Sequence, residues 1–192
     1  MATRPLTKIT EEEYLRLERA AQQKSEFVHG EMFAMAGGSL QHALIAARFI
    51  AELTTQLQGR DCRVFSSDLK VRTSVSGSHL YPDVSVVCGP PQPFENSVDV
   101  LTNPNVVVEV LSPSTANYDR GGKFELYREI DSLADYVLVH PAVPHVEHFA
   151  RQSDDSWIFR EYRGLESSIS LASIDCTVAL GSVYAGVLDL PE

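Results

Sequence analysis

The 192-residue chain is predicted to fold as one α/β domain with a mixed central sheet and antiparallel hairpins at the sheet edges. Strand-like runs alternate with helix-like periodicities along the chain, which favours a sheet covered by helices. With 44% hydrophobic residues and no internal repeat or linker, residues 1–192 can bury one sizeable core.

The N-terminal half contains sequence signals for where its helices and strands begin and end. Thr10 and Glu13 form a capping box, and the apolar residues of 40–57 recur with the clearest helical period in the chain. Asp83 follows Pro82 at the mouth of a strand-like run. The expected elements are a helix from Thr10 to about Gln23, two strands within 26–36, a helix over 40–57, and strands at 62–65, 69–73 and 81–87.

The C-terminal half begins with a proline-rich segment, 89–105, which we expect to be a surface loop. A hairpin is expected around residues 152–155. The expected elements are a strand that opens at Val106 and ends near Glu109, a helix capped by Asn117 or Asp119, strands at 133–139, 146–150 and 157–162, and a strand with a closing turn or helix in 169–187.

The most informative stretch is residues 105–130. Its β-branched run, Val106 to Val108, is suited to a strand buried on both faces, and Glu109 follows where that strand should end. A buried carboxylate requires a metal ion or a basic partner, because burial without one costs several kcal/mol. Lys123 lies near the start of the next helix.

The net charge and the cysteine content of the chain limit which binding partners and which cellular compartment are expected. The formal net charge of −10 argues against non-specific coating of nucleic acid, although it allows one local contact with DNA. Cys62, Cys88 and Cys176 are odd in number and widely spaced, so neither a disulfide framework nor a zinc site is predicted. We expect a cytoplasmic protein without a signal peptide or membrane span.

Two carboxylates converging from neighbouring strands can hold Mg²⁺ or Mn²⁺, and a nearby lysine can offset anionic charge during phosphodiester hydrolysis. Simpler interpretations stay open. Asp83 can be a turn residue, Glu109 can form a structural ion pair with Lys123 or Arg120, and His42 can be a helix-capping or surface residue. The histidines at 140, 145 and 148 are interpreted as structural, because prolines between them suit a strand-turn-strand.

Four segments together resemble a known family: EFVHGEMFAMAGGSLQH, YPDVSVV, NVVVEVLSPSTANYDRGGKFELYREI and ADYVLVHP. They are similar to the putative restriction endonuclease group of the PD-(D/E)xK nuclease superfamily, over most of residues 24–150. The resemblance implies a restriction-endonuclease-like fold. It also implies Asp83 and Glu109 as metal ligands, with the main-chain carbonyl of Val110 as a further ligand.

One position departs from the superfamily pattern. The third residue of (D/E)xK should be lysine, but Leu111 stands there. In the family that this chain resembles, the lysine has moved to the following helix, and Lys123 fits that place. The resemblance further implies that Glu31 and His42 approach the same cleft and that Tyr127 supports it.

The function predicted from these residues is a Mg²⁺-dependent endonuclease (or Mn²⁺-dependent) that hydrolyses DNA with metal-activated water. Asp83, Glu109 and Lys123 are its catalytic residues. A homodimer is expected, because one small domain reaches one strand of a duplex and twofold symmetry is the commonest arrangement. The alternative is a catalytically silent binding or regulatory module of the same fold, since no DNA-reading element is evident.

Overall fold

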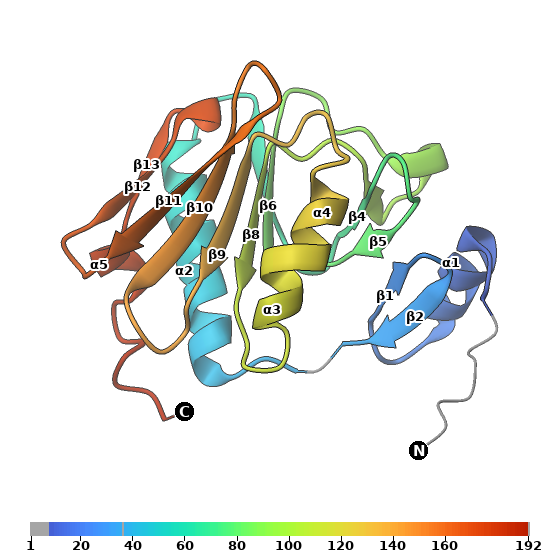
Figure 1. Ribbon diagram of the computed structural model, residues 1–192, viewed down its shortest axis with the longest axis horizontal. Coiled ribbons are helices and arrows are strands. Elements are labelled where there is room, and N and C mark those ends of the chain that lie inside the picture. Colours follow the sequence, from blue (N-terminus) through green and yellow to red (C-terminus); the bar gives the residue numbers. More distant parts are fainter. Residues whose placement is uncertain (1–7, 36, 192) are drawn as a thin grey trace.

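The computed structural model describes residues 8–35 and 37–191. Its centre is a six-stranded sheet in the order β11-β10-β9-β8-β6-β3, in which β8 and β9 are parallel and the other neighbours antiparallel (Figure 1). Its strands are β3 (Cys62–Ser66), β6 (Val84–Cys88), β8 (Val106–Val110), β9 (Asp135–Val139), β10 (His145–Arg151) and β11 (Trp157–Arg163).

Helices cover both faces of this sheet (Figure 1). The helix expected over 40–57 is confirmed as α2 (Leu40–Gln56), which buries Ile45, Phe49 and Leu53 against one face. The hairpin β12 (Ser168–Leu171) and β13 (Cys176–Ala179), with α5 (Leu180–Val183), completes that layer. The opposite face is covered by a continuous helical segment made of α3 (Ala116–Tyr118), a π-helical turn (Asp119–Lys123) and α4 (Phe124–Tyr127).

A second sheet stands beside the first, in the order β2-β1-β5-β4-β7. Its strands are β1 (Ser25–Val28), β2 (Glu31–Ala34), β4 (Lys70–Arg72), β5 (His79–Leu80) and β7 (Val100–Leu101). Helix α1 (Glu11–Ala20) packs on β1 through the buried Tyr14, whose hydroxyl donates to the Ser25 carbonyl. The α/β class with a mixed sheet and antiparallel hairpins is therefore confirmed.

Most differences from the predicted elements concern boundaries. Thr10 is the N-cap, since its hydroxyl accepts from the Glu13 amide at 3.2 Å, but the Glu13 carboxylate pairs with Arg16 and so only half of the expected capping box forms. The helix ends at Ala20. The strand expected over 81–87 is confirmed as β6 but begins at Val84, and the two residues before Tyr81 form β5 in the other sheet. The loop 89–105 contains the short strand β7 and a 3₁₀ turn, Phe94–Asn96. Ala36, the expected end of the second strand, lies outside the described residues.

The expectation of no disulfide was wrong. Cys62 lies directly opposite Cys88 in the β3-β6 ladder, and the two sulfurs are bonded. A separation of 26 residues conceals this pairing, because only the strand register places the two side chains together. Cys176 is free and buried.

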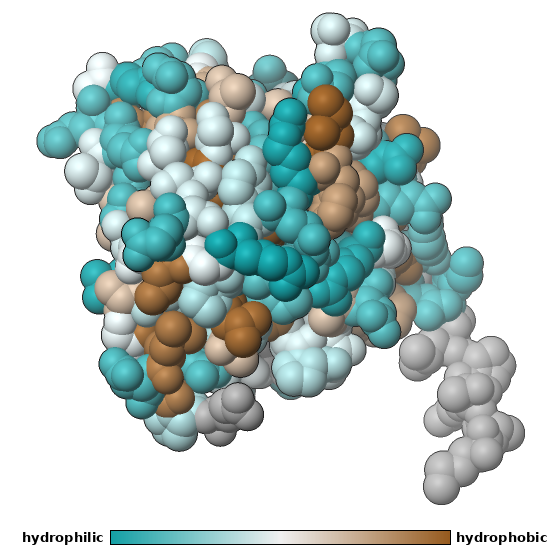
Figure 2. All heavy atoms as spheres, turned by 60° about the vertical axis from the view of Figure 1, so that its left-hand side comes forward, coloured by the Kyte–Doolittle hydropathy of each residue, from teal (hydrophilic) through white to brown (hydrophobic). Residues whose placement is uncertain are grey.

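No helix in the described part of the chain is long and apolar enough to cross a membrane. The face seen in Figure 2 is largely hydrophilic, and its apolar side chains occur in small separate groups.

Candidate active site

The antiparallel pairing of β6 with β8 brings the two predicted metal ligands together. Val84 pairs with Val108, so Asp83, just before β6, lies beside the end of β8. Its Oδ2 accepts a hydrogen bond from the Val110 amide at 2.7 Å. Asp83 therefore touches the strand that carries Glu109.

Glu109 is buried in β8 and lies on the face of the sheet that the helical segment covers. Its Oε1 is 2.8 Å from the Lys123 ammonium and accepts a hydrogen bond from the Tyr127 hydroxyl at 2.9 Å. Lys123 is itself buried, with 7% of its side chain exposed. The lysine predicted to replace that of (D/E)xK thus lies against the acid and not in solvent.

The hairpin of the second sheet contributes an acid that the sequence analysis did not single out. Glu26 in β1 lies 3.0 Å from the Lys123 ammonium and accepts from the Tyr81 amide at 3.0 Å. Glu31, which the resemblance implied, is on the same sheet face opposite Val28. Among the described residues, the Glu31 carboxylate makes no hydrogen bond or ion pair, so Glu26 is the hairpin acid that contacts Lys123.

His42 lies in the first turn of α2, and its side chain does not cap the helix. Its amide donates to the Ser39 hydroxyl, which caps α2, at 3.2 Å. Its Nε2 lies 2.8 Å from Asp83 Oδ1. The first turn of α2 therefore presents an imidazole to the site and fixes the orientation of the Asp83 carboxylate.

The helical segment that carries Lys123 begins before either predicted cap. Thr115 occupies the N-cap position, and the Ser112 hydroxyl accepts from its amide at 3.2 Å. Asp119 is buried inside the segment and accepts from the Thr115 hydroxyl at 2.7 Å, so its expected capping role was wrong. The turn Asp119–Lys123 is π-helical, a geometry that is frequent at functional sites.

Negative charge exceeds positive charge at this site. Burial raises the pKa of Glu109 well above its ordinary value, and Asp83, Asp119 and Glu26 add to this while Lys123 opposes it. Burial also raises the pKa of Asp119. Burial alone would lower the pKa of Lys123, but the surrounding carboxylates outweigh it and raise that pKa well above the ordinary value. The lysine is therefore cationic, and an added cation would favour ionised Glu109.

These donors fit a hard divalent cation. Asp83 and Glu109 offer carboxylate oxygens from neighbouring strand ends, and the Val110 carbonyl lies on the same strand. The excess of buried acids over one lysine supplies the compensating charge that such an ion requires. This set contains no nitrogen or sulfur ligand, apart from the adjacent His42, and is therefore of the type that suits Mg²⁺ or Mn²⁺.

Comparison with known proteins identifies the family. The sequence model of Uma2, described as putative restriction endonuclease, matches residues 11–180. The chain belongs to the Uma2 family. This Uma2 protein is 37% identical over 183 residues to the uncharacterized protein slr1290 of Synechocystis sp., covering 95% of each chain. It is 36% identical over 164 residues to the uncharacterized protein sll1609 of the same organism, covering 85% of this chain and 93% of that one.

The fold of this Uma2 protein is also found in a solved structure, a putative nuclease belonging to DUF820 from Anabaena variabilis. The two superpose with a TM-score of 0.77 over 94% of this chain and 99% of the other, at 16% sequence identity. The restriction-endonuclease-like fold is therefore shown, and it agrees with the family match.

Proposed function

We propose that this chain is a Mg²⁺- or Mn²⁺-dependent endonuclease that hydrolyses DNA phosphodiester bonds. The observation that carries the proposal is the contact of buried Lys123 with Glu109, at 2.8 Å, beside Asp83 at the same strand end. A lysine pointing to solvent would have favoured the catalytically silent module. The match to a restriction endonuclease family supports the same conclusion.

Each side chain has a distinct task in the proposed mechanism. Asp83, Glu109 and the Val110 carbonyl would hold the cation, which when bound acidifies a water molecule and polarises the scissile phosphate. Lys123 orients the attacking water and neutralises charge that develops on the phosphate oxygens. His42 holds Asp83 in position, and Tyr127 donates to Glu109, which fixes the direction of that carboxylate.

Titration calorimetry with Mg²⁺ or Mn²⁺ tests the site. The wild type should bind the ion, whereas Asp83→Ala and Glu109→Ala should bind it at least about tenfold more weakly and lose plasmid nicking, because each removes a charged ligand. The matched control is Asp189→Ala, which removes an acid outside the site. A wild type that neither binds the ion nor nicks DNA would favour the silent binding module, and binding and nicking that are equal in all four proteins would show that Asp83 and Glu109 do not form the site.

The proposal includes a homodimer in the cytoplasm. Sedimentation at micromolar concentration tests the dimer, and a monomer that still makes double-strand breaks in one encounter would refute it.

The Cys62–Cys88 disulfide counts against a cytoplasmic location, because disulfides are rare there. Blocking free thiols at the moment of cell lysis shows whether Cys62 and Cys88 are bonded in the cell. Two free thiols at these positions agree with the cytoplasm, and a persistent disulfide does not.

A further inference from the structure

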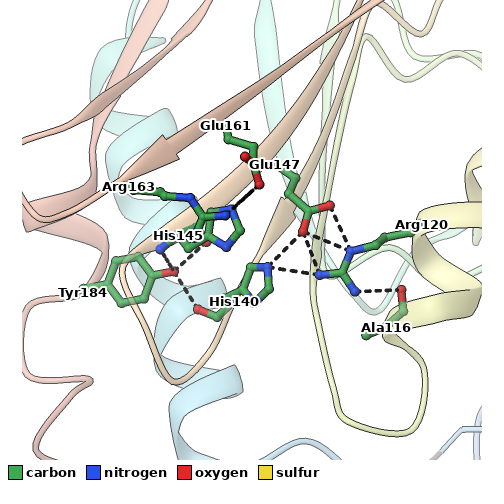
Figure 3. A network of polar contacts seen from close by, with 8 residues as sticks. All are labelled: Ala116, Arg120, His140, His145, Glu147, Glu161, Arg163 and Tyr184. Carbon is green, nitrogen blue, oxygen red and sulfur yellow. Dashed lines mark hydrogen bonds and ion pairs between the residues drawn. The ribbon is translucent and has the colours of Figure 1, made fainter.

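A second cluster of side chains of the types that can bind a metal ion lies on the same face of the sheet, next to Arg120 of the helical segment (Figure 3). His140 follows β9, and His145 and Glu147 belong to β10. Their ligand atoms all lie within 4.8 Å of one another. None of the three was assigned to a site by the sequence, and none contacts Asp83, Glu109 or Lys123 in the described part of the chain.

The backbone around the two histidines is held in place. The His140 amide donates to the His145 carbonyl at 3.0 Å, which closes the turn between them. The Tyr184 hydroxyl lies 2.6 Å from the His140 carbonyl and 3.1 Å from that of His145 (Figure 3). This geometry explains why residues separated in sequence by two prolines present both imidazoles to one place.

The charges in this cluster are arranged unusually for a sheet surface. Glu147 lies directly opposite Glu161 in the β10-β11 ladder, and like charges in that relation are destabilising. Arg120 from the π-helical turn compensates, because its guanidinium donates to both Glu147 oxygens at 2.9 Å and 2.7 Å. The same guanidinium lies 3.1 Å from His140 Nε2, which is itself 2.9 Å from Glu147. Arg120 thus occupies the place where a cation would bind.

We propose that His140, His145 and Glu147 form a second metal site, which takes a borderline divalent ion such as Zn²⁺ in exchange for Arg120. Two imidazoles and one carboxylate are ligands that such ions prefer, whereas Mg²⁺ prefers oxygen. The imidazoles are stacked with centroids 4.2 Å apart, so one ring must turn about its Cβ–Cγ bond to share an ion. His140 has room to do so, since 25% of its side chain is exposed. Glu161, which accepts from His145 at 3.0 Å, is the adjacent fourth group.

Zn²⁺ and Co²⁺ titrations of the intact protein test this site, in an Asp83→Asn background that disables the first site. Co²⁺ should give the visible absorption of a low-coordinate ion, and one equivalent of Zn²⁺ should displace it. His140→Ala should weaken Zn²⁺ binding at least about tenfold, because one of three ligands is lost. His29→Asn removes an imidazole from a distant turn and should bind Zn²⁺ like the parent.

Arg120→Gln gives the sharpest result, because it should tighten Zn²⁺ binding by about tenfold by removing a charge-assisted competitor for Glu147. Circular dichroism establishes that each variant is folded. If the parent and folded Arg120→Gln bind Zn²⁺ no better than His140→Ala, the cluster is a structural ion-pair network and the proposal is wrong. This outcome is independent of the nuclease proposal, which depends on Mg²⁺ binding and nicking in the Asp83-containing protein.

Discussion

Lys123 is the residue on which the proposed chemistry depends, and its role can be separated by experiment from that of the proposed metal ligands. Lys123→Met should reduce the nicking rate by on the order of 100-fold, because it removes the cation that stabilises charge in the transition state. It should bind Mg²⁺ at least as tightly as the wild type, since a positive charge next to Glu109 is gone. The assays are nicking and calorimetry on the same samples.

Lys70 supplies a matched control for that substitution. It is buried to a similar degree and is paired with two acids, Glu18 and Asp99, each at 2.8 Å, away from the site. Lys70→Met should lower the free energy of unfolding by about 3 kcal/mol, because it strands a buried charge, yet leave nicking unchanged well below the unfolding temperature. An equal loss of nicking in both variants would show that Lys123 acts through stability alone.

Asp99 predicts part of the acid sensitivity of the protein. The hydrogen bond from Arg19, opposed by partial burial and assisted by Lys70, lowers its pKa from 3.8 to about 2. Between these values the unfolded chain binds more protons than the folded one, so this contribution to stability is complete above about pH 4 and is lost as the pH falls through about 2. Urea unfolding across this range should show a loss on the order of 2 kcal/mol in the wild type. Asp99→Asn should remove the part of that slope which Asp99 contributes, while Glu11 and Asp68, whose pKa values are also lowered, keep theirs. An unchanged slope would contradict the assignment.

The π-helical turn is the element that places Lys123, and its two glycines are not equivalent. A Cβ at Gly121 would meet no atom within 4 Å, whereas one at Gly122 would lie 3.1 Å from the Tyr118 ring. Gly121→Ala should stabilise the fold by about 0.5–1 kcal/mol, because alanine loses less backbone entropy in a helix. Gly122→Ala should gain less stability and lower nicking, because Tyr118 and the turn must shift.

Thermal unfolding and nicking of the two alanine variants measure this difference. Equal stability and equal activity would show that the turn tolerates displacement and that its geometry is not needed to hold Lys123.

Sequence patterns predicted elements well where a single periodicity decides the structure. The α2 helix and strand β8 were located within a residue, because apolar spacing and β-branched runs are local signals. The division of residues 79–88 between two sheets was missed, because it depends on which strands pair. The Cys62–Cys88 bond and the contact of Glu26 with Lys123 were missed for the same reason, since both arise between segments far apart in sequence. The regular alternation of β1 gave no signal that Glu26 is buried in a site.

At the scale of the whole molecule, the site lies where two sheets and two helical layers meet. The six-stranded sheet supplies Asp83 and Glu109, the second sheet supplies Glu26, and α2 and the helical segment supply His42 and Lys123. The sequence predicted that Asp83 and Glu109 converge at neighbouring strand ends, and the family resemblance added His42. No local rule pointed to Glu26. Given the net charge of −10, binding of DNA should depend on the bound cation more than on a basic surface.

The central claim is tested most directly by the rate of supercoiled plasmid nicking as a function of Mg²⁺ concentration, in the wild type and in Glu109→Gln. Glutamine keeps the shape of the side chain and removes its charge. The wild-type rate should rise and saturate with Mg²⁺, and the rate of Glu109→Gln should fall by about 100-fold or more at every concentration. Nicking that is absent from the wild type in both Mg²⁺ and Mn²⁺, or equal in the two proteins, would contradict the assignment of this site as a nuclease centre.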